Sequence, residues 1–330
     1  MKNIGIIGTG YYVPNMTWTN HDLAKMVDTT DEWIFTKTGI KERRIADPCE
    51  ATSDLALYAC LDALKDADLR ADEIDLIVLA TSSPDMLQPS TAAILQGKLG
   101  AFNAAAFDVS AVCAGFIFAV TVAAGMMRGL GYKNVLVVGA ETYSRIMDWK
   151  DRNTCVFFGD GAGAIILSEA GEEGFIDSFI MNNGRGWDVI KFPAGGSRIP
   201  ATRESVDKGL HAFTMQGKNV WDFAIRVFPE SIRTVINKSG YKIEDIDWVI
   251  SHQANINIIK TSLDILGIPF EKTFTTIRNY GNTSGASIPI TLAEAAKKNL
   301  FKEGDLIAMV GFGGGLSWGA ALFKWVKKNK

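Results

Sequence analysis

The apolar positions of the chain form short continuous runs that alternate with longer helical patterns. Such runs occupy residues 3–7, 74–79, 135–138, 249–250 and 306–310. A continuous apolar run is typical of a strand buried on both faces, as in a parallel sheet covered by helices. Helical patterns run through residues 55–69 and 220–236 and end in polar turns. The alternation predicts a layered α/β protein.

Two pairs of similar segments indicate an internal duplication. Asp72-Glu-Ile-Asp-Leu-Ile-Val-Leu79 resembles Glu244-Asp-Ile-Asp-Trp-Val-Ile-Ser251, and Val135-Leu-Val-Val-Gly139 resembles Ile307-Ala-Met-Val-Gly311, both at an offset of 172 residues. The same offset places Cys113 opposite Gly285, each just before an apolar helix. We therefore expect two similar halves, residues 1–170 and 171–330, that direct a strand-to-helix turn at one central place. The polar segment 168–174 is the expected boundary.

The stretch 111–127 is apolar except for Thr121 and is close to the shortest length that can cross a bilayer. Its glycines and alanines suit close packing inside a protein, and Asp108 and Arg128 bracket it tightly. We interpret it as a fully buried central helix rather than a membrane span. Residues 182–211 show little periodicity and predict a long functional loop.

Composition and charge narrow the function classes. The 330 residues include 34 Lys and Arg against 37 Asp and Glu, a net charge of −3 without a basic block before the C-terminal tail, so a nucleic-acid partner is not expected. Four cysteines without ligand spacing and three scattered histidines predict no metal site. The reduced thiols and the absence of a recognisable export signal favour a cytoplasmic protein.

Three residues are candidates for chemistry. Cys113 stands at the start of the buried helix, where backbone N–H groups and the helix dipole favour a thiolate, although most such cysteines are simply small buried hydrophobic residues. His252 follows the strand at 249–250, at the carboxyl end where ligands of α/β sheets bind. Asn282 lies in the turn that corresponds to Cys113, where a capping role is the plain alternative.

Three glycine-rich segments invite comparison with ligand-binding loops. Gly311-Phe-Gly-Gly-Gly-Leu-Ser-Trp-Gly319 follows a buried strand and could offer N–H donors to an oxyanion, or form a tight structural turn. Gly159-Asp-Gly-Ala-Gly163 is interpreted as a packing turn, because no Walker lysine follows it. Gly5-Ile-Ile-Gly-Thr-Gly10 runs into Val13-Pro14 instead of a helix, so it does not predict a dinucleotide site.

Taken together, the motifs resemble the β-ketoacyl-[acyl-carrier-protein] synthase III family of the thiolase superfamily, from Gly5 to Trp318. The resemblance rests on Asp31-Glu-Trp-Ile, Thr38-Gly-Ile-Lys-Glu-Arg-Arg44, Cys113-Ala-Gly-Phe, Asp151-Arg, Phe158-Gly-Asp-Gly-Ala-Gly163, His252-Gln-Ala-Asn, Gly281-Asn-Thr-Ser and Phe312-Gly-Gly-Gly. It implies a five-layered αβαβα fold made of two similar halves and a homodimer. It also implies initiation of fatty-acid or polyketide synthesis from a short acyl-CoA and a malonyl-[acyl-carrier protein], with coenzyme A thioester as substrate and no cofactor or membrane partner.

The resemblance also assigns roles. It makes Cys113 the acyl acceptor and His252 with Asn282 the pair that binds the malonyl thioester. The backbone N–H groups of Cys113 and Gly314 would form a second oxyanion hole. The remaining implied positions are Trp33, Lys37, Arg152, Asn255 and Phe312 for coenzyme A or substrate, Gln88 for the partner's acyl pocket, and Arg226, Asn257 and Lys260 for carrier-protein docking.

Several positions depart from the family pattern. Asn257 stands where an arginine is common, and Asp222 and Asp264 occupy lysine positions, which predicts weaker attraction for an acidic carrier protein. Lys37 replaces an arginine near the coenzyme site, Asn153 a glycine, and Gln88 a phenylalanine that shapes the acyl pocket. Primer length and acceptor are accordingly open.

Three alternatives remain at this point. The first is a specialised condensing or acyl-transfer enzyme of secondary metabolism with another acceptor. The second is a papain-like cysteine hydrolase, since Cys, His and Asn occur in the same order, although the sequence around Cys113 does not match. The third is a non-catalytic scaffold that keeps the fold.

Overall fold

A computed structural model describes residues 3–171 and 174–326, and its two large sheets hold strands from the N-terminal and the C-terminal half of the chain, respectively. The first sheet has the order β1-β7-β6-β4-β5 and the second β11-β12-β13-β8. The first comprises β1 (Ile4–Tyr12), β4 (Leu76–Ala80), β5 (Ala105–Val109), β6 (Val135–Glu141) and β7 (Gly161–Glu169). The second comprises β8 (Phe175–Asn182), β11 (Trp248–Ser251), β12 (Leu306–Gly313) and β13 (Ser317–Lys324). The predicted division at 170/171 remains a prediction, although no strand of either sheet crosses it.

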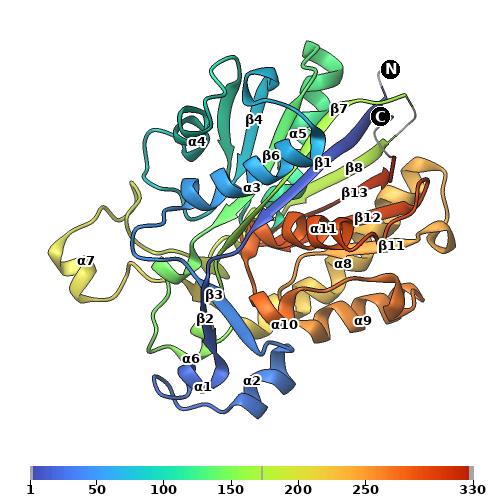
Figure 1. Cartoon of the computed structure of the whole chain (residues 1–330). Coiled ribbons are helices and arrows are strands. Elements are labelled where there is room, and N and C mark those ends of the chain that lie inside the picture. The colour runs from blue at the N-terminus through green and yellow to red at the C-terminus, as the bar shows by residue number, and fades with distance from the viewer. Residues whose placement is uncertain (1–2, 172–173, 327–330) are drawn as a thin grey trace.

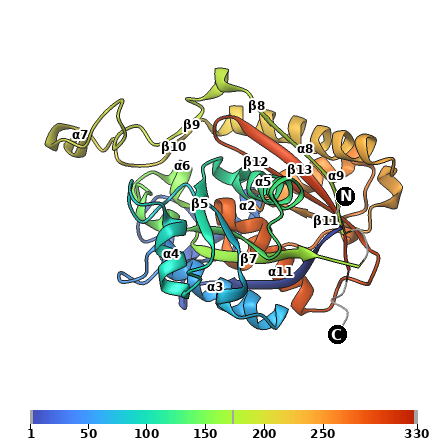
Figure 2. The ribbon, with the colours of Figure 1, turned by 90° about the horizontal axis from the view of Figure 1, so that it is seen from above.

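Helices separate and cover the two sheets, which gives five layers (Figures 1 and 2). The outer layer on the first sheet contains α3 (Thr52–Ala67) and α4 (Thr91–Leu99). The middle layer contains α5 (Gly115–Leu130) and α11 (Ser287–Lys297), both of which contact strands of both sheets. The other outer layer contains α8 (Gly217–Ser239), which packs on the second sheet, and α9 (Ile256–Leu266), which packs on α8. The predicted αβαβα fold is confirmed.

The duplication is visible in the backbone. β4 pairs in parallel with β6, and β11 pairs in parallel with β12; β6 then pairs antiparallel with β7, and β12 with β13. The 3-10 turns η2 (Val112–Ala114) and η7 (Ser284–Ala286) precede α5 and α11, again 172 residues apart. Val112 and Ser284, which correspond, both have positive φ, +49° and +47°. The two halves thus reach the centre with the same unusual bend.

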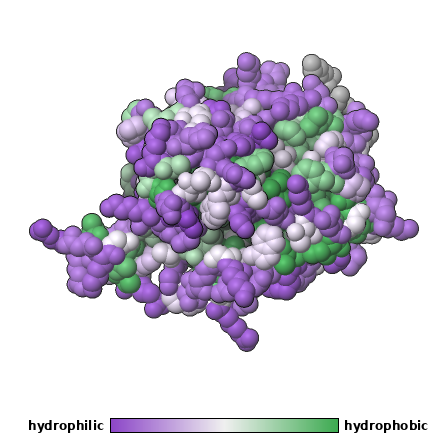
Figure 3. Space-filling view, turned by 90° about the horizontal axis from the view of Figure 1, so that it is seen from below, coloured by the Kyte–Doolittle hydropathy of each residue, from purple (hydrophilic) through white to green (hydrophobic). Residues whose placement is uncertain are grey.

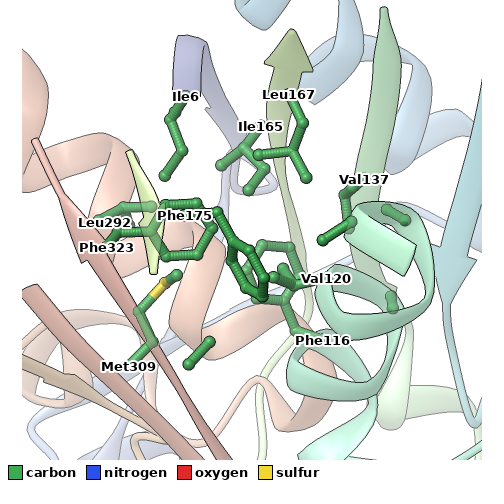
Figure 4. Close-up of a cluster of buried hydrophobic side chains, with 14 of the residues drawn as sticks. Ile6, Phe116, Val120, Val137, Ile165, Leu167, Phe175, Leu292, Met309 and Phe323 are labelled. Carbon is green, nitrogen blue, oxygen red and sulfur yellow. The ribbon is translucent and has the colours of Figure 1, made fainter. Parts of the chain in front are cut away.

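The middle layer joins the two halves through a cluster of buried apolar side chains. In Figure 4, Phe116 and Val120 of α5 lie among Ile165 and Leu167 of the first sheet and side chains that include Phe175, Met309 and Phe323 of the second. Burial of a large apolar side chain contributes about 1.5–3 kcal/mol, so this cluster is a major source of stability. Gly163 belongs to the close packing as well, because an added Cβ would lie 2.4 Å from the backbone nitrogen of Ile290. The predicted packing role of segment 159–163 is therefore confirmed, but the predicted turn is wrong, because Gly161 and Gly163 lie in strand β7.

The stretch 112–130 is the one helix in the described ranges that is long and apolar enough to cross a membrane, and it forms the core helix α5. Just over half of its apolar window, 56%, is buried. The expectation that residues 111–127 form a fully buried helix was wrong in part, because Gly125 is exposed and Thr121, Val122 and Met126 are only half-buried. Its N-terminal end, which carries Cys113, is buried.

Shorter elements form an appendage around the site. They are β2 (Met16–Thr19), α1 (Asn20–Leu23), α2 (Asp31–Thr38), β3 (Glu42–Ile45), α6 (Arg152–Cys155) and α10 (Ile277–Tyr280). The predicted long loop contains only short elements, the 3-10 turn η4 (Gly184–Gly186), β9 (Ile190–Lys191) and α7 (Arg203–Asp207), before the strand β10 (Thr214–Met215) pairs back to β9. It projects from the body with a mainly hydrophilic surface and a few apolar side chains (Figure 3).

Candidate active site

A cavity of about 100 Å³ lies where the two central turns meet. Cys113, His252 and Asn282 all line it, although they are up to 169 positions apart in the chain. The structure thus brings together the three candidate residues. The other lining residues are mostly apolar: Phe157, Phe158, Ile190, Phe213, Met215, Gly217, Val220, Trp221, Ala254, Asn255, Ile258, Phe312 and Gly313.

Cys113 is held in η2 directly before α5 and is only 6% exposed. Its Sγ lies 3.3 Å from the Oγ of Ser284, which is in the corresponding turn of the second half. On the other side, a Cβ added to Gly313 would come within 2.7 Å of the Cys113 Cβ. Glycine at 313 therefore gives the strand end room to approach the sulfur.

The environment of Cys113 favours the thiol over the expected thiolate. The pKa of Cys113 is raised to about 12, chiefly by burial; the Ser284 hydrogen bond lowers the pKa and the nearby Glu141 charge raises it. The helix terminus alone does not overcome the loss of solvent. Attack on a substrate therefore requires that the thiol proton leave Sγ.

His252 is neutral and held rigidly. It follows β11, its backbone nitrogen donates to the Val310 carbonyl at 2.8 Å, and the ring is 2% exposed. Nδ1 shares a 2.7 Å hydrogen bond with Ser287 Oγ, and the Phe312 ring packs edge-on with centroids 5.3 Å apart. Burial lowers the pKa of His252 to about 3. Ser287 Oγ has a single proton and two acceptors within reach, His252 Nδ1 and the Ser284 carbonyl at 2.8 Å; when the proton goes to Nδ1, Nε2 carries the only ring proton.

Asn282 has its amide orientation set by the backbone. Its Oδ1 accepts from the Ser284 nitrogen at 2.8 Å, so its Nδ2 is left as the donor group. The Asn282 backbone makes two hydrogen bonds to the segment 157–159: its N–H donates to Phe157 O at 2.8 Å, and its carbonyl accepts from Gly159 N at 3.1 Å. With His252, the cavity therefore has two neutral side chains that can offer N–H donors. The alternative of a helix cap is not observed: Thr283 is the residue before η7 and makes no side-chain cap bond, whereas Asn282 closes the preceding turn by accepting from Ser284 N.

Sequence reasoning missed a buried polar network behind the sulfur. Glu141, at the carboxyl end of β6, is fully buried and accepts from Ser82 Oγ at 2.8 Å and Ser83 Oγ at 2.5 Å. Ser82 Oγ is 3.0 Å from the Tyr143 hydroxyl, which also hydrogen-bonds to Ser284. The sequence held two signals: a charged residue closing an apolar strand, and a serine next to the position that corresponds to Cys113.

The predicted coenzyme residues gather at the appendage. The Arg152 guanidinium carbon lies 5.0 Å from the Trp33 ring centroid, and its Nη1 donates to the Asp28 carbonyl at 2.7 Å. The two side chains contact each other, so an adenine between them would require a separation of about 7 Å, two ring thicknesses. Lys37 is exposed in the last turn of the same helix, α2, as Trp33. Their coenzyme role remains a prediction.

The α2 helix is tied to the cavity wall by two asparagines. Asn255 caps α9, lines the cavity, and donates through Nδ2 to the Lys37 carbonyl at 2.9 Å. Asn257 donates to the carbonyls of Thr36 at 3.3 Å and Lys37 at 3.1 Å. The amide of Asn257 thus satisfies backbone carbonyl groups in the last turn of α2.

Other predicted positions lie outside the cavity. Gln88 is exposed on the loop before α4, and Gly314 follows the lining residue Gly313. Of the docking candidates, Arg226 pairs with Glu230 at 3.3 Å, and Lys260 lies over the Phe270 ring at 5.5 Å. These roles stay predictions.

No cluster of three or more His, Cys, Asp or Glu side chains suited to a metal ion occurs in residues 3–171 and 174–326. The chemistry available in the cavity is that of a cysteine and two neutral hydrogen-bond donors.

Comparisons with known proteins agree with this site. Residues 107–184 match the family "3-Oxoacyl-[acyl-carrier-protein (ACP)] synthase III", and residues 236–325 match its C-terminal part. A β-ketoacyl-[acyl-carrier-protein] synthase III of Caldanaerobacter subterraneus subsp. tengcongensis is 50% identical over 98% of both chains.

Solved structures extend the similarity to the whole fold. The 3-oxoacyl-[acyl-carrier-protein] synthase III of Aquifex aeolicus VF5 is 44% identical, with a TM-score of 0.90 over 98% of this chain and 100% of that one. The priming β-ketosynthase of the R1128 polyketide biosynthetic pathway is 31% identical, with a TM-score of 0.91 over 99% and 97%.

The five layers and the cysteine at their centre define a thiolase-fold protein of the condensing-enzyme class. Within that class, the chain belongs to the β-ketoacyl-[acyl-carrier-protein] synthase III family, which is also called 3-oxoacyl-[acyl-carrier-protein] synthase III. Family membership removes the papain-like alternative.

Proposed function

We propose that the protein catalyses the decarboxylating condensation of a short acyl-CoA with malonyl-[acyl-carrier protein], which initiates fatty-acid synthesis. The observation that carries the proposal is the meeting of Cys113, His252 and Asn282 on one cavity. A thiolate is both a good nucleophile toward a thioester and a good leaving group, so Cys113 can accept an acyl group and surrender it to carbon. The family membership supports the same reaction.

The first half-reaction would load Cys113. Its sulfur attacks the acyl-CoA carbonyl, and the backbone N–H groups of Cys113 and Gly314 are the proposed donors to the oxyanion. The cavity volume of about 100 Å³ equals that of roughly three water molecules in the liquid, so its size supports a short primer. Trp33, Lys37 and Arg152 would hold the coenzyme A moiety outside, and Asn255 and Phe312 would line the inner passage.

The second half-reaction would use His252 and Asn282. Loss of CO2 from the malonyl group develops an enolate oxygen, which His252 Nε2–H and Asn282 Nδ2–H would stabilise together. Because burial holds the pKa of His252 at about 3, both donors are neutral and neither acts as a general base. The enolate carbon then attacks acyl-Cys113.

A specialised ketosynthase with another acceptor is the second candidate. This candidate is supported by Asn257, which has no positive charge to attract an acidic carrier protein. Its side-chain amide donates instead to two carbonyl groups of α2. Arg226 and Lys260 would have to provide that attraction. The similarity to a polyketide priming enzyme points the same way.

We also propose that the protein is cytoplasmic and forms a homodimer. Support for the dimer comes from β5, which ends the first sheet, and from the exposed Leu87 beside Gln88, at 82%. An edge strand with free backbone groups and a largely exposed apolar side chain each favour a second copy as partner. Gln88 would then shape the acyl pocket of that copy.

Intact-protein mass spectrometry after incubation with a panel of acyl-CoAs tests the proposal. We expect the mass of one short acyl group on the wild-type protein and on Cys49→Ala, the control for an exposed thiol, and none on Cys113→Ala. Addition of malonyl-[acyl-carrier protein] labelled at the free carboxylate should then release labelled CO2. Loading without CO2 release would favour the second candidate, and loading of Cys113→Ala would refute the nucleophile.

A further inference from the structure

Three hydroxyl groups, those of Ser284, Tyr143 and Ser82, lie between the Cys113 thiol and the buried carboxylate of Glu141. The chain runs from Cys113 Sγ to Ser284 Oγ at 3.3 Å, to the Tyr143 hydroxyl, and to Ser82 Oγ at 3.0 Å, which donates to Glu141 Oε1 at 2.8 Å. Each hydroxyl group in the chain can accept one proton while it donates another. The proposed reaction described above leaves this buried acid without a role.

The direction of the chain follows from its last member. Ser82 gives its single proton to Glu141, so the bond between Ser82 and Tyr143 must be donated by the phenol. Tyr143 can then accept from Ser284, and Ser284 from the Cys113 thiol. Every hydrogen bond in this arrangement leads from the sulfur to the carboxylate.

Glu141 is placed to be an anion at the end of this chain. Both carboxylate oxygens accept a backbone N–H, Oε2 from Ser82 at 3.0 Å and Oε1 from Gly285 at 3.3 Å. A backbone N–H cannot reverse its direction, so these bonds favour the ionised form. Hydroxyl groups of Thr81 and Ser83 donate to Oε2 as well.

We infer that Glu141 is the proton acceptor for Cys113, through Ser284, Tyr143 and Ser82, and that it holds this proton while the cysteine is acylated. The inference rests on the proposed function. In the loading step the Sγ–H bond breaks, the proton relay protonates Glu141, the sulfur forms the new thioester, and coenzyme A leaves as its thiolate. In the condensation step CO2 leaves, the enolate carbon takes the acyl group, and the released Cys113 thiolate recovers its proton from Glu141. Charge balances in both steps.

The relay would solve a problem set by burial. The pKa of the Cys113 thiol is raised to about 12 by loss of solvent, and burial also raises the pKa of Glu141. The charged or titratable groups that bear on the connecting phenol of Tyr143 are Cys113 and Glu141 themselves. The acceptor role is not assigned to His252, because burial lowers the pKa of its ring to about 3 and makes it a poor base for the thiol proton.

Rapid-quench loading with acyl-CoA, read by intact-protein mass spectrometry across pH, tests the relay. Tyr143→Phe removes the connecting hydroxyl but keeps the ring that stacks on Phe158 at 4.8 Å, and Glu141→Gln keeps the shape of the acceptor. We expect both variants to load about 100-fold more slowly near neutral pH, the low end of what positioned proton transfer contributes. Their rates should rise about tenfold per pH unit, since solution base must replace the relay, whereas the wild-type rate stays nearly flat.

The matched control is Tyr58→Phe, which removes an exposed phenol outside the chain and should load like the wild type. Slower wild-type loading in D2O, with a curved dependence on the D2O fraction, is expected because several protons move together. Wild-type rates and a flat pH profile in Tyr143→Phe would overturn the relay, even if Glu141→Gln loads slowly. If Glu141→Gln does not fold, Tyr143→Phe alone decides. Absence of acyl adduct on the wild type would instead refute the proposed function.

Discussion

Asn282→Asp separates the two half-reactions of the proposed mechanism. The substitution keeps the size of the side chain and the acceptor that bonds to Ser284 N at 2.8 Å. It replaces the Nδ2 donor by an oxygen. The enolate formed from the malonyl group would therefore lose one of its two donors, while the oxyanion site proposed for loading at Cys113 is unchanged.

The expected magnitude follows from the loss of one donor. Removal of a single oxyanion-hole donor costs about 2.7–4 kcal/mol, or roughly 100- to 1000-fold in rate. If the aspartate is ionised, repulsion of the enolate adds to this loss, so the figure is a lower bound. Loading of Cys113 should stay within about threefold of the wild type.

Two measurements check this prediction. Acyl loading is followed by intact-protein mass spectrometry, and release of labelled CO2 from malonyl-[acyl-carrier protein] is followed separately. Asn282→Ala is the companion variant, because it also leaves the Ser284 N–H without its acceptor and should lower the free energy of unfolding by about 1–3 kcal/mol. An Asn282→Asp protein that decarboxylates normally, or that loses loading and decarboxylation equally, would refute the division of roles.

His252, Trp33 and Gly139 supply three further predictions. The unfolded chain binds a proton at His252 below about pH 6.5 whereas the native ring does so near pH 3; stability should therefore fall as the pH is lowered across this window, by up to about 1.4 kcal/mol per pH unit from this residue, and denaturation curves of His252→Asn should lack that contribution. Trp33→Ala should raise KM for acyl-CoA about tenfold with little change in kcat. This corresponds to the loss of roughly 1.4 kcal/mol of ring contact with Arg152 or adenine. An unchanged KM would show that Trp33 is not part of the coenzyme site. Gly139→Ala would place a Cβ 2.4 Å from the Gly285 carbonyl oxygen, so urea denaturation should show at least about 1–3 kcal/mol of destabilisation, and wild-type stability would contradict the close contact.

The sequence predicted the strands whose neighbours on both faces are apolar. β4, β6 and β12 are continuous hydrophobic runs because helices cover both sides of their sheets. β7 and β13 were not recognised, since Gly161, Gly163 and Gly319 suggest turns where the structure uses them for close packing in strands. Glycine identity alone does not separate a tight turn from a tight contact.

The same limit applies to the site. Cys113 could be predicted because a cysteine at a strand-to-helix turn is well placed to act as a nucleophile, and its repeat offset led to the turn that contains Asn282. Ser284 and Glu141 could not be assigned, because serine is common in turns and the pairing of position 141 with position 285 depends on tertiary contact. The charge state of Cys113 likewise depends on burial, which the sequence does not give.

The duplicated bend also accounts for the single reactive centre of a two-fold architecture. Gly285 occupies the place that Cys113 has in the other half, and a Cβ there would lie 3.1 Å from Glu141 Oε1 and 3.2 Å from the Val112 carbonyl. A second thiol at position 285 would therefore crowd Glu141, the acid on which the first thiol is proposed to depend. The N-terminal half carries the reactive cysteine, and the C-terminal half has a glycine, without a side chain, at the corresponding position.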